Sequence, residues 1–416
     1  DHCPAPDVDL DGSLQLQISA LAYNSFQGVI GVGRIRRGQL KRNQQVTVVD
    51  RDGGTRNGKI LQILGYFGLE RIEQQTATAG DIVCITGLDP LSISDTICST
   101  DVPEGLPPLT VDEPTVSMTF QVNDSPFAGR DGKYVTSRNI KDRLDRELIH
   151  NVALRVEQGD TPDKFVVSGR GELHLSVLIE SMRREGFELG VSRPEVIVRD
   201  NDGVKEEPFE YVVIDIEDQH QGAVMEAMGL RKGDMKNMAP DGQGRLRLEY
   251  IIAARGLIGF RSQFLTMTSG TGIMSHVFDH YGPVKAGDLG NRINGVLVSM
   301  TDGATTAYSL YNLQDRGRLM VGPGVDVYEG MLLGIHARDN DLPVNPVKGK
   351  QLTNIRAAGT DENLILTPSI KMTLESALEF IDDDELVEVT PAHIRLRKKL
   401  LKESDRKRAG RSKAAS

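Results

Sequence analysis

The sequence has 416 residues, of which 39% are apolar and 26% are charged. This length exceeds what one hydrophobic core usually organises, and no run approaches the ~20 apolar residues that a membrane-spanning helix needs. We therefore expect a soluble protein of several domains, in which a net charge of −10 disfavours nucleic-acid binding by the chain as a whole.

Residues 1–11 hold two prolines and four aspartates and begin with Asp1 rather than methionine. We expect a linker here that follows a domain outside this sequence. The three cysteines, Cys3, Cys84 and Cys98, are odd in number and lack CxxC spacing. This favours a reducing cytoplasm over a disulfide framework.

Residues 12–108 alternate short apolar runs with glycine-rich turns. Leu14, Leu16 and Ile18 alternate with polar residues, and no helical period persists before Leu106. The pattern predicts an all-β barrel, ended by the proline-rich linker at 103–108.

The next two segments, 109–200 and 201–284, share one order of elements, β-α-β-β-α-β. In the first, the apolar spacing predicts strands at 116–122, 153–157, 164–168 and 187–191 and helices around 140–148 and 175–182. In the second, it predicts strands at 209–216, 233–238, 245–252 and 273–281 and helices at 221–230 and 260–267. This order is typical of a ferredoxin-like α+β sandwich, an open sheet with two helices on one face.

Residues 285–402 follow neither plan, and we expect a separate α+β domain with an acidic helix around 373–380. The acidic run 382–385 lacks the spacing of a calcium loop, so we expect it to end that helix and face water. Beyond Lys402 the apolar periodicity fades, and 403–416 are predicted to be a basic, disordered tail.

Motifs for catalysis are weak. No GxxxxGK[ST] loop occurs, and the DxxG form of Asp241–Gly244 reads first as a hairpin turn. His276 and His280 are four residues apart in a predicted strand, where their side chains would be ~13 Å apart, so a structural role is favoured over zinc binding. We expect no catalytic, cofactor-binding or metal-binding residue in this chain.

Positive charge gathers near the C-terminal end. From Pro391 to Ser416 ten basic residues face two acidic ones, an excess of 10 − 2 = +8. The polar stretch 338–356 is also too long for a routine connection. Binding to a polyanion needs several accessible cations rather than one fixed geometry, so both regions are candidates for RNA contact, with a solvated surface as the alternative. The candidate residues are Arg338, Lys348, Lys350, Arg356, Arg395, Arg397, Lys398 and Lys399.

Several stretches resemble a known family. Residues 33–41 are similar to the barrel that follows the G domain in translational GTPases. Residues 168–175 and 254–261 resemble segments of the third and fifth domains of elongation factor G, without the domain that separates them there. Residues 313–317, 359–362 and 377–391 resemble the C-terminal domain peculiar to the BipA/TypA family of translational GTPases.

The resemblance implies the ribosome-binding part of a translational GTPase that acts in large-subunit assembly and stress-dependent translation. The implied partners are rRNA, ribosomal proteins and the A-site tRNA, which the 338–356 loop would reach, and a cytoplasmic monomer is expected. GTP and Mg would bind in a G domain outside this sequence, so the whole protein would hydrolyse GTP and this chain would not. The alternatives are a protein-binding scaffold outside the ribosome and, with least support, a hydrolase that uses His174 or the His276/His280 pair.

Overall fold

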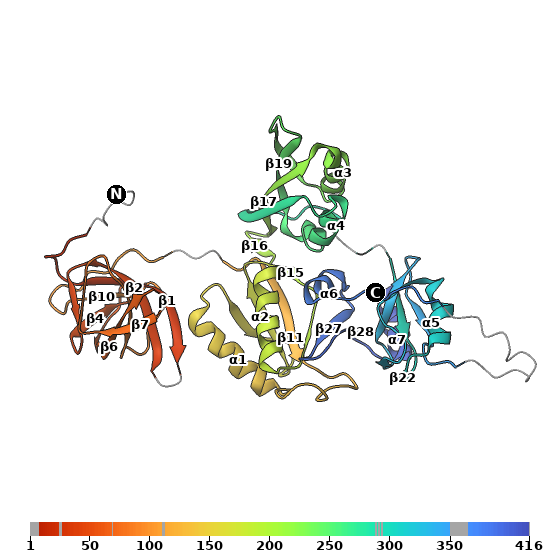
Figure 1. The fold of residues 1–416 in the computed structure, drawn as a ribbon, viewed down its shortest axis with the longest axis horizontal. Coiled ribbons are helices and arrows are strands. Elements are labelled where there is room, and N and C mark those ends of the chain that lie inside the picture. The colour runs from red at the N-terminus through yellow and green to blue at the C-terminus, as the bar shows by residue number, and fades with distance from the viewer. Residues whose placement is uncertain are drawn as a thin grey trace, which may run out of the picture. The chain divides into compact units, whose positions relative to one another are not determined.

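The computed structural model describes residues 8–24, 27–68, 70–109, 113–287, 289, 292, 294–349 and 365–415. The chain divides into two compact units. Figure 1 shows their helices and strands. One comprises Asp1–Glu113 with Asp142–Arg155, and the other comprises Pro114–Lys141 with Val156–Ser416.

The first unit is built on an antiparallel sheet, in agreement with the β-rich pattern of residues 12–108. Eight strands pair in the order β5-β4-β10-β1-β2-β9-β6-β7, and β3 pairs with β8. Leu16, Ile18 and Ile35 are completely buried in its core, because every second residue of β1 and β2 points inward. The strands are β1 (Gln15–Asn24), β2 (Gly28–Arg37), β3 (Gln39–Lys41), β4 (Gln45–Val49), β5 (Thr55–Lys59), β6 (Gln62–Phe67), β7 (Glu70–Gln74), β8 (Thr76–Thr78), β9 (Ile82–Thr86) and β10 (Thr96–Cys98).

The chain from 114 to 191 has the predicted β-α-β-β-α-β order and belongs to the second unit except for residues 142–155. Its elements are β11 (Val116–Val122), α1 (Ser137–His150), β12 (Arg155–Gln158), β13 (Lys164–Gly169), α2 (Glu172–Glu185) and β14 (Leu189–Val191). The strands pair in the order β12-β13-β11-β14, and β15 (Glu195–Val196) pairs with β11. Leu175, Ile179 and Met182 form the buried face of α2, as their spacing predicted.

This sheet continues beyond β14 into strands from the far end of the chain. β27 (Glu385–Val389) pairs with β14, placing Glu388 opposite Gly190, and β28 (Ile394–Lys398) pairs with β27. Phe127 also packs edge-on against Tyr328, with ring centroids 4.9 Å apart. The C-terminal strands therefore extend the sheet of the first sandwich, a pairing that the predicted domain boundaries did not include.

The second sandwich also has the predicted order of elements. They are β16 (Arg199–Asn201), β17 (Val204–Glu217), η1 (Asp218–His220), α3 (Gln221–Leu230), β18 (Asp234–Pro240), β19 (Arg245–Ala253), η2 (Ala254–Gly256), α4 (Phe260–Met267) and β20 (Ile273–Pro283). The strands pair in the order β16-β17-β19-β18, and β20 also pairs with β17. Val212, Met228 and Phe264 are buried between this sheet and its helices.

The C-terminal region adds a four-stranded sheet in the order β23-β25-β21-β26, in which β21 and β26 are parallel. Leu297, Leu310 and Leu333 lie in its core. Its elements are β21 (Val296–Ser299), β22 (Gly303–Ala304), α5 (Ala307–Gln314), β23 (Gly317–Leu319), β24 (Asp326–Val327), β25 (Leu332–His336), β26 (Leu342–Val344) and α6 (Leu374–Phe380), the acidic helix that was predicted.

The basic end of the chain forms a helix, α7 (Glu403–Ala415), where we predicted a disordered tail. Arginine, lysine and alanine are good helix formers, and Glu403 and Asp405 in the first turn favour the helix dipole. Lys407 also pairs with Glu403 one turn earlier, at 2.5 Å. Among the described helices, none is both long enough and apolar enough to cross a bilayer.

Candidate nucleic-acid interface

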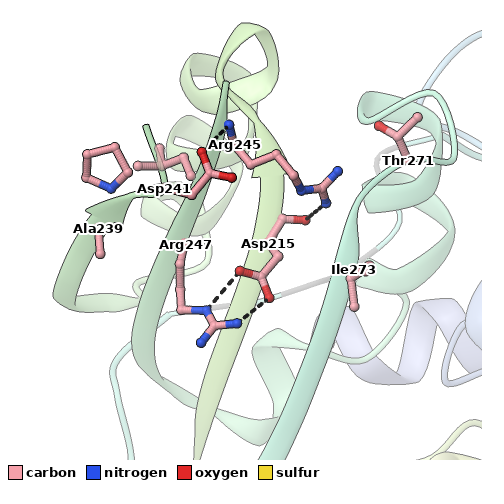
Figure 2. Close-up of a pocket in the computed structure, with 9 residues that line it drawn as sticks. Asp215, Ala239, Asp241, Arg245, Arg247, Thr271 and Ile273 are labelled. Carbon is pink, nitrogen blue, oxygen red and sulfur yellow. Dashed lines mark hydrogen bonds and ion pairs between the residues drawn. The ribbon is translucent and has the colours of Figure 1, made fainter. Parts of the chain in front are cut away.

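A shallow hollow lies over β18 and β19 of the second sandwich (Figure 2). Arg247 donates two hydrogen bonds to the carboxylate of Asp215, at 2.9 and 3.0 Å, and Arg245 donates to the Asp215 carbonyl at 3.4 Å. Asp241 accepts the backbone N–H groups of Gln243 and Arg245, which lowers its pKa and closes the hairpin turn that the sequence favoured. The arginines of the hollow are therefore already engaged by oxygen atoms of the protein.

The two histidines considered for zinc lie on the strand β20, as predicted. His276 hydrogen-bonds Glu210, which raises the pKa of His276, whereas His280 contacts Asp279 at 2.6 Å and stacks on Phe209. No group of three or more His, Cys, Asp or Glu side chains suited to a metal occurs among the residues that the structure describes.

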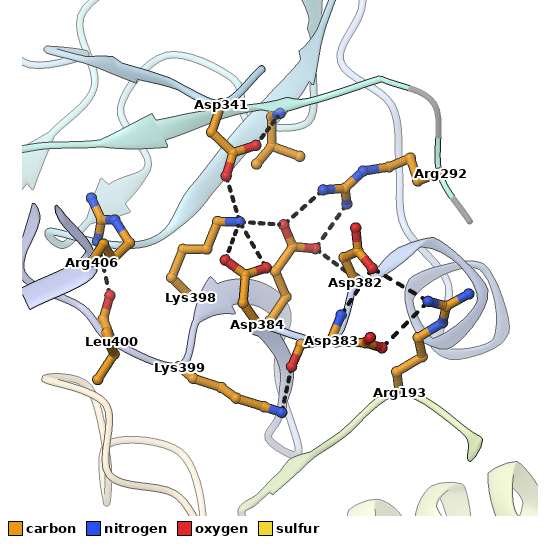
Figure 3. Close-up of polar contacts among 12 residues, drawn as sticks. Arg193, Arg292, Asp341, Asp382, Asp383, Asp384, Lys398, Lys399, Leu400 and Arg406 are labelled. Atoms are coloured by element: carbon orange, nitrogen blue, oxygen red, sulfur yellow. Dashed lines mark hydrogen bonds and ion pairs between the residues drawn. The ribbon is translucent and has the colours of Figure 1, made fainter. Parts of the chain in front are cut away.

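Lys398, predicted to contact RNA, lies inside the protein (Figure 3). Its side chain is 2% exposed, and its Nζ lies 2.6 Å from Asp341, 2.9 Å from Asp384 and 2.9 Å from Glu385. Arg292 donates two hydrogen bonds to the same Glu385 carboxylate, at 2.8 and 2.9 Å. The ammonium group is therefore surrounded by the protein's own carboxylates.

Burial and pairing act on this cluster in opposite directions. Burial alone would lower the pKa of Lys398, but the carboxylates of Glu385, Asp341 and Asp384 outweigh it and raise that pKa. Burial would likewise raise the pKa of Glu385, but the hydrogen bonds and charge of Arg292 outweigh it and lower that pKa. Both groups are held in their charged forms.

Other basic residues near the end of the chain are similarly engaged. The Arg397 side chain is fully buried and pairs with Asp124, while Arg395, 11% exposed, pairs with Glu388 at 3.0 Å. We therefore correct the assignment of Arg395, Arg397 and Lys398, since a buried and paired cation cannot reach a phosphate without disrupting the fold. Lys399 is exposed, and its Nζ donates to the backbone carbonyl of Asp383.

The acidic run 382–385 is the partner of these cations rather than a wholly solvated face. Asp382 and Asp383 accept from Arg193 at 3.3 and 3.4 Å, and Glu385 is completely buried. The prediction that the run faces water therefore fails for Glu385, because cations from β28 and from Arg292 compensate its burial.

The predicted loop retains two accessible cations. Arg338, which follows β25, and Lys348, which follows β26, are exposed. Neither pairs with a carboxylate of a residue that the structure describes. Lys350 and Arg356, the other predicted contacts in this loop, lie outside the described residues.

Helix α5 holds the segments on both sides of residues 350–364. At its start, Thr306 donates its hydroxyl to the carbonyl of Lys348 at 2.8 Å and its N–H to that of Pro346 at 3.0 Å. At its end, the amide of Gln314 donates to the carbonyl of Ile365 at 3.3 Å and accepts the N–H of Thr367 at 3.1 Å. Since eight helical residues span about 12 Å, Lys348 and Ile365 are both held close to one short helix.

Two further exposed arginines lie beside this helix and were missed by the sequence analysis. Arg316 and Arg318 follow the end of α5 and frame Gly317, the first residue of β23. Within the described chain neither pairs with a carboxylate. Their spacing of two residues could have indicated a pair of cations on one face, because side chains two apart along a strand point to the same side. We call Arg316, Arg318, Arg338 and Lys348 the cationic loop base.

Comparison with known proteins assigns three parts of the chain. Residues 28–98 match the family described as elongation factor Tu domain 2, residues 204–291 match elongation factor G C-terminus, and residues 294–403 match TypA/BipA C-terminal domain. The chain is thus a β-rich assembly of translation-factor domains.

Curated relatives match almost the whole chain. "Large ribosomal subunit assembly factor BipA" of Escherichia coli K12 is 64% identical over 412 residues, which is 99% of this chain and 68% of that protein. The proteins of the same name from Haemophilus influenzae and Buchnera aphidicola are 61% and 56% identical, again over 99% of this chain and over 67% and 68% of theirs. The chain belongs to the BipA family, which confirms the resemblance noted in its sequence.

Proposed function

We propose that this chain is the ribosome-binding arm of a large-subunit assembly factor and that its cationic loop base contacts ribosomal RNA. The relatives carry the name of such a factor, and the same region supplies cations that are exposed and free of carboxylate partners among the described residues. The observation that carries the proposal is the fixing of both flanks of residues 350–364 on α5, because an ordered base presents charge with little loss of entropy.

The wider role follows the family. In the whole protein a preceding G domain would bind GTP and Mg and hydrolyse GTP, while this cytoplasmic, monomeric arm would contact rRNA, A-site tRNA and ribosomal proteins without catalysis of its own. Large-subunit assembly and stress-dependent translation are the proposed processes. Predicted contacts by Lys350, Arg356 and the exposed Lys399 remain part of the proposal.

Co-sedimentation with purified large ribosomal subunits across a salt series tests the loop base. Changing Arg316, Arg318, Arg338 and Lys348 together to Gln removes up to four phosphate contacts, each of which contributes about 0.7 to 0.9 to the slope of log K against log salt concentration. We expect the slope to become shallower by about 3. Arg51→Gln is the control, because it changes an exposed arginine of the first unit and leaves the loop base intact. An unchanged slope contradicts the RNA contact, and salt-insensitive capture of proteins without rRNA favours the scaffold alternative.

A further inference from the structure

The exposed face of α5 carries two tyrosines. Tyr308 is half-buried and Tyr311 is 40% exposed, while Ser309, Leu310 and Leu313 form the buried face. Residues three apart on a helix are neighbours, so the two rings lie one turn apart on the side away from the core. Neither hydroxyl has a hydrogen-bond partner within the described residues, and neither ring takes part in an aromatic pair there.

Cations stand at both ends of this tyrosine face. Lys348 is fixed at the start of α5 through its carbonyl and Thr306, and Arg316 and Arg318 begin two residues after the helix ends. The one carboxylate between the helix and these arginines in the sequence is Asp315. Two adjacent aromatic rings with positive charge on either side form the arrangement that binds unpaired nucleotides, since rings stack on bases and cations hold the phosphates between them.

We infer that α5 is a stacking platform for single-stranded RNA, in which Tyr308 and Tyr311 hold unpaired bases and the loop base holds the flanking phosphates. This inference rests on the proposed function and deepens it, because it names an unpaired strand rather than a duplex as the preferred RNA. An A-form duplex keeps its bases stacked on one another, so it meets the cations and leaves the tyrosines unused.

The same two rings would also suit a protein partner, because tyrosine and arginine are enriched at protein interfaces. RNA is favoured here because the three exposed cations on either side of the helix outnumber the one neighbouring carboxylate, Asp315. Thr306 caps that helix by accepting the N–H of Ser309 at 3.1 Å and donates to the carbonyl of Lys348, so the backbone of Lys348 is held at the start of the platform.

Fluorescence anisotropy with two labelled RNAs tests the platform in the intact chain. One probe is an RNA hairpin with an unpaired 3′ tail, and the other is the same hairpin with a blunt end. Tyr308→Leu and Tyr311→Leu retain apolar bulk, and each should weaken binding of the tailed hairpin about tenfold while leaving the blunt hairpin unchanged. Tyr308→Phe and Tyr311→Phe retain the ring and should bind the tailed hairpin like the unmodified chain.

Spectroscopy adds a second readout. The chain has nine tyrosines and no tryptophan, so its near-ultraviolet emission comes from tyrosine alone. The tailed hairpin should quench part of this emission, and the double Leu variant should lose that part. Tyr23→Leu, at an exposed tyrosine of the first unit, serves as the matched control and should change neither the affinity nor the quenching caused by the tail.

The outcomes distinguish a failure of the proposed RNA contact from a failure of the stacking platform. If the unmodified chain binds neither hairpin, the proposed RNA contact itself fails. If it binds both, and the Leu variants hold the tailed hairpin as tightly as before, the platform is refuted while the loop base stands. If the Leu variants bind both hairpins normally but lose large subunits, the tyrosines contact a protein, and the inference is overturned.

Discussion

Replacement of Lys398 by methionine separates a structural from an RNA-binding role for the C-terminal cations. The change keeps the length and apolar stem of the side chain but leaves Glu385, which is completely buried, with Arg292 as its remaining cationic partner. Breaking a buried ion pair in this way costs about 3 to 5 kcal/mol, because one buried charge loses its compensation. With a urea dependence of about 2 to 3 kcal/mol per molar, the unfolding midpoint should fall by about 1 to 2.5 M.

Urea unfolding followed by circular dichroism measures this change, and the neighbouring Lys399 provides the control. Lys399 is exposed, so Lys399→Met should alter the free energy of unfolding by less than about 0.5 kcal/mol. The pH dependence adds a check of sign. The pKa of Glu385 is lowered in the folded protein, so its contribution to stability is present above its unfolded pKa and is lost as pH falls through the folded value. In the Lys398→Met chain this acid-sensitive part should shrink. A loss in stability below about 1 kcal/mol would refute the reasoning.

Two further predictions concern backbone packing and titration. Gly317→Ala would place a Cβ atom 1.9 Å from the carbonyl oxygen of Ile335, so β23 must move away from β25; we expect a loss of about 1 to 3 kcal/mol in thermal melts and weaker RNA binding. Gly322→Ala, where no atom lies within 4 Å, should leave both unchanged. Hydrogen bonds from Arg183 and Arg184 lower the pKa of Glu180 to about 2. The contribution of Glu180 to stability should therefore be present above pH ~4.3 and be lost toward pH 2, and Glu180→Gln should flatten that part of the stability profile. A carboxyl NMR titration of Glu180 with a midpoint near ~4.3 would contradict this prediction.

The order of elements within each sandwich could be predicted because it is a local property. The apolar spacing on α2 and α4, and the alternation along β11 and β17, repeat within a few residues and are readable from the sequence. The pairing of β14 with β27 could not be predicted in this way. It joins residues that are far apart in sequence, and neither strand's own pattern specifies its partner.

The sequence contains a pattern that indicates the pairing of Arg395 and Lys398, but the apolar periodicity does not detect it. In the β27–β28 hairpin Glu385 stands opposite Lys398 and Glu388 opposite Arg395, so the acidic and basic runs are in register across the turn at Pro391. Opposite charges directly across an antiparallel pair stabilise each other. Treating the two runs as one hairpin would have indicated ion pairing within the protein. Counting the net charge of residues 391–416 alone indicated an exposed site that binds a polyanion.

The loop base was only partly predictable for a different reason. Arg338 and Lys348 could be identified as candidates because they lie in a long polar stretch. Arg316 and Arg318 lie at a short strand, where the sequence pattern does not indicate a binding site. Their proximity to Arg338 depends on the pairing of β23 with β25, next to which the N–H of Ala337 donates to the carbonyl of Arg316. Such a contact follows from three-dimensional geometry and has no counterpart in spacing along the chain.

The late strands of the first sandwich also bear on how the protein is made. After Val191 leaves the ribosome, 385 − 191 = 194 further residues must be added before Glu385 leaves it. At about 5 to 20 residues per second this is a delay of about 10 to 40 s, during which β14 has an uncovered hydrogen-bonding edge. During this interval the edge of β14 in the nascent chain can pair with a wrong strand. A shortened chain that ends before β27 would keep this unpaired edge permanently. Loss of ribosome binding in such a truncation would therefore reflect a damaged first sandwich as well as a missing C-terminal region.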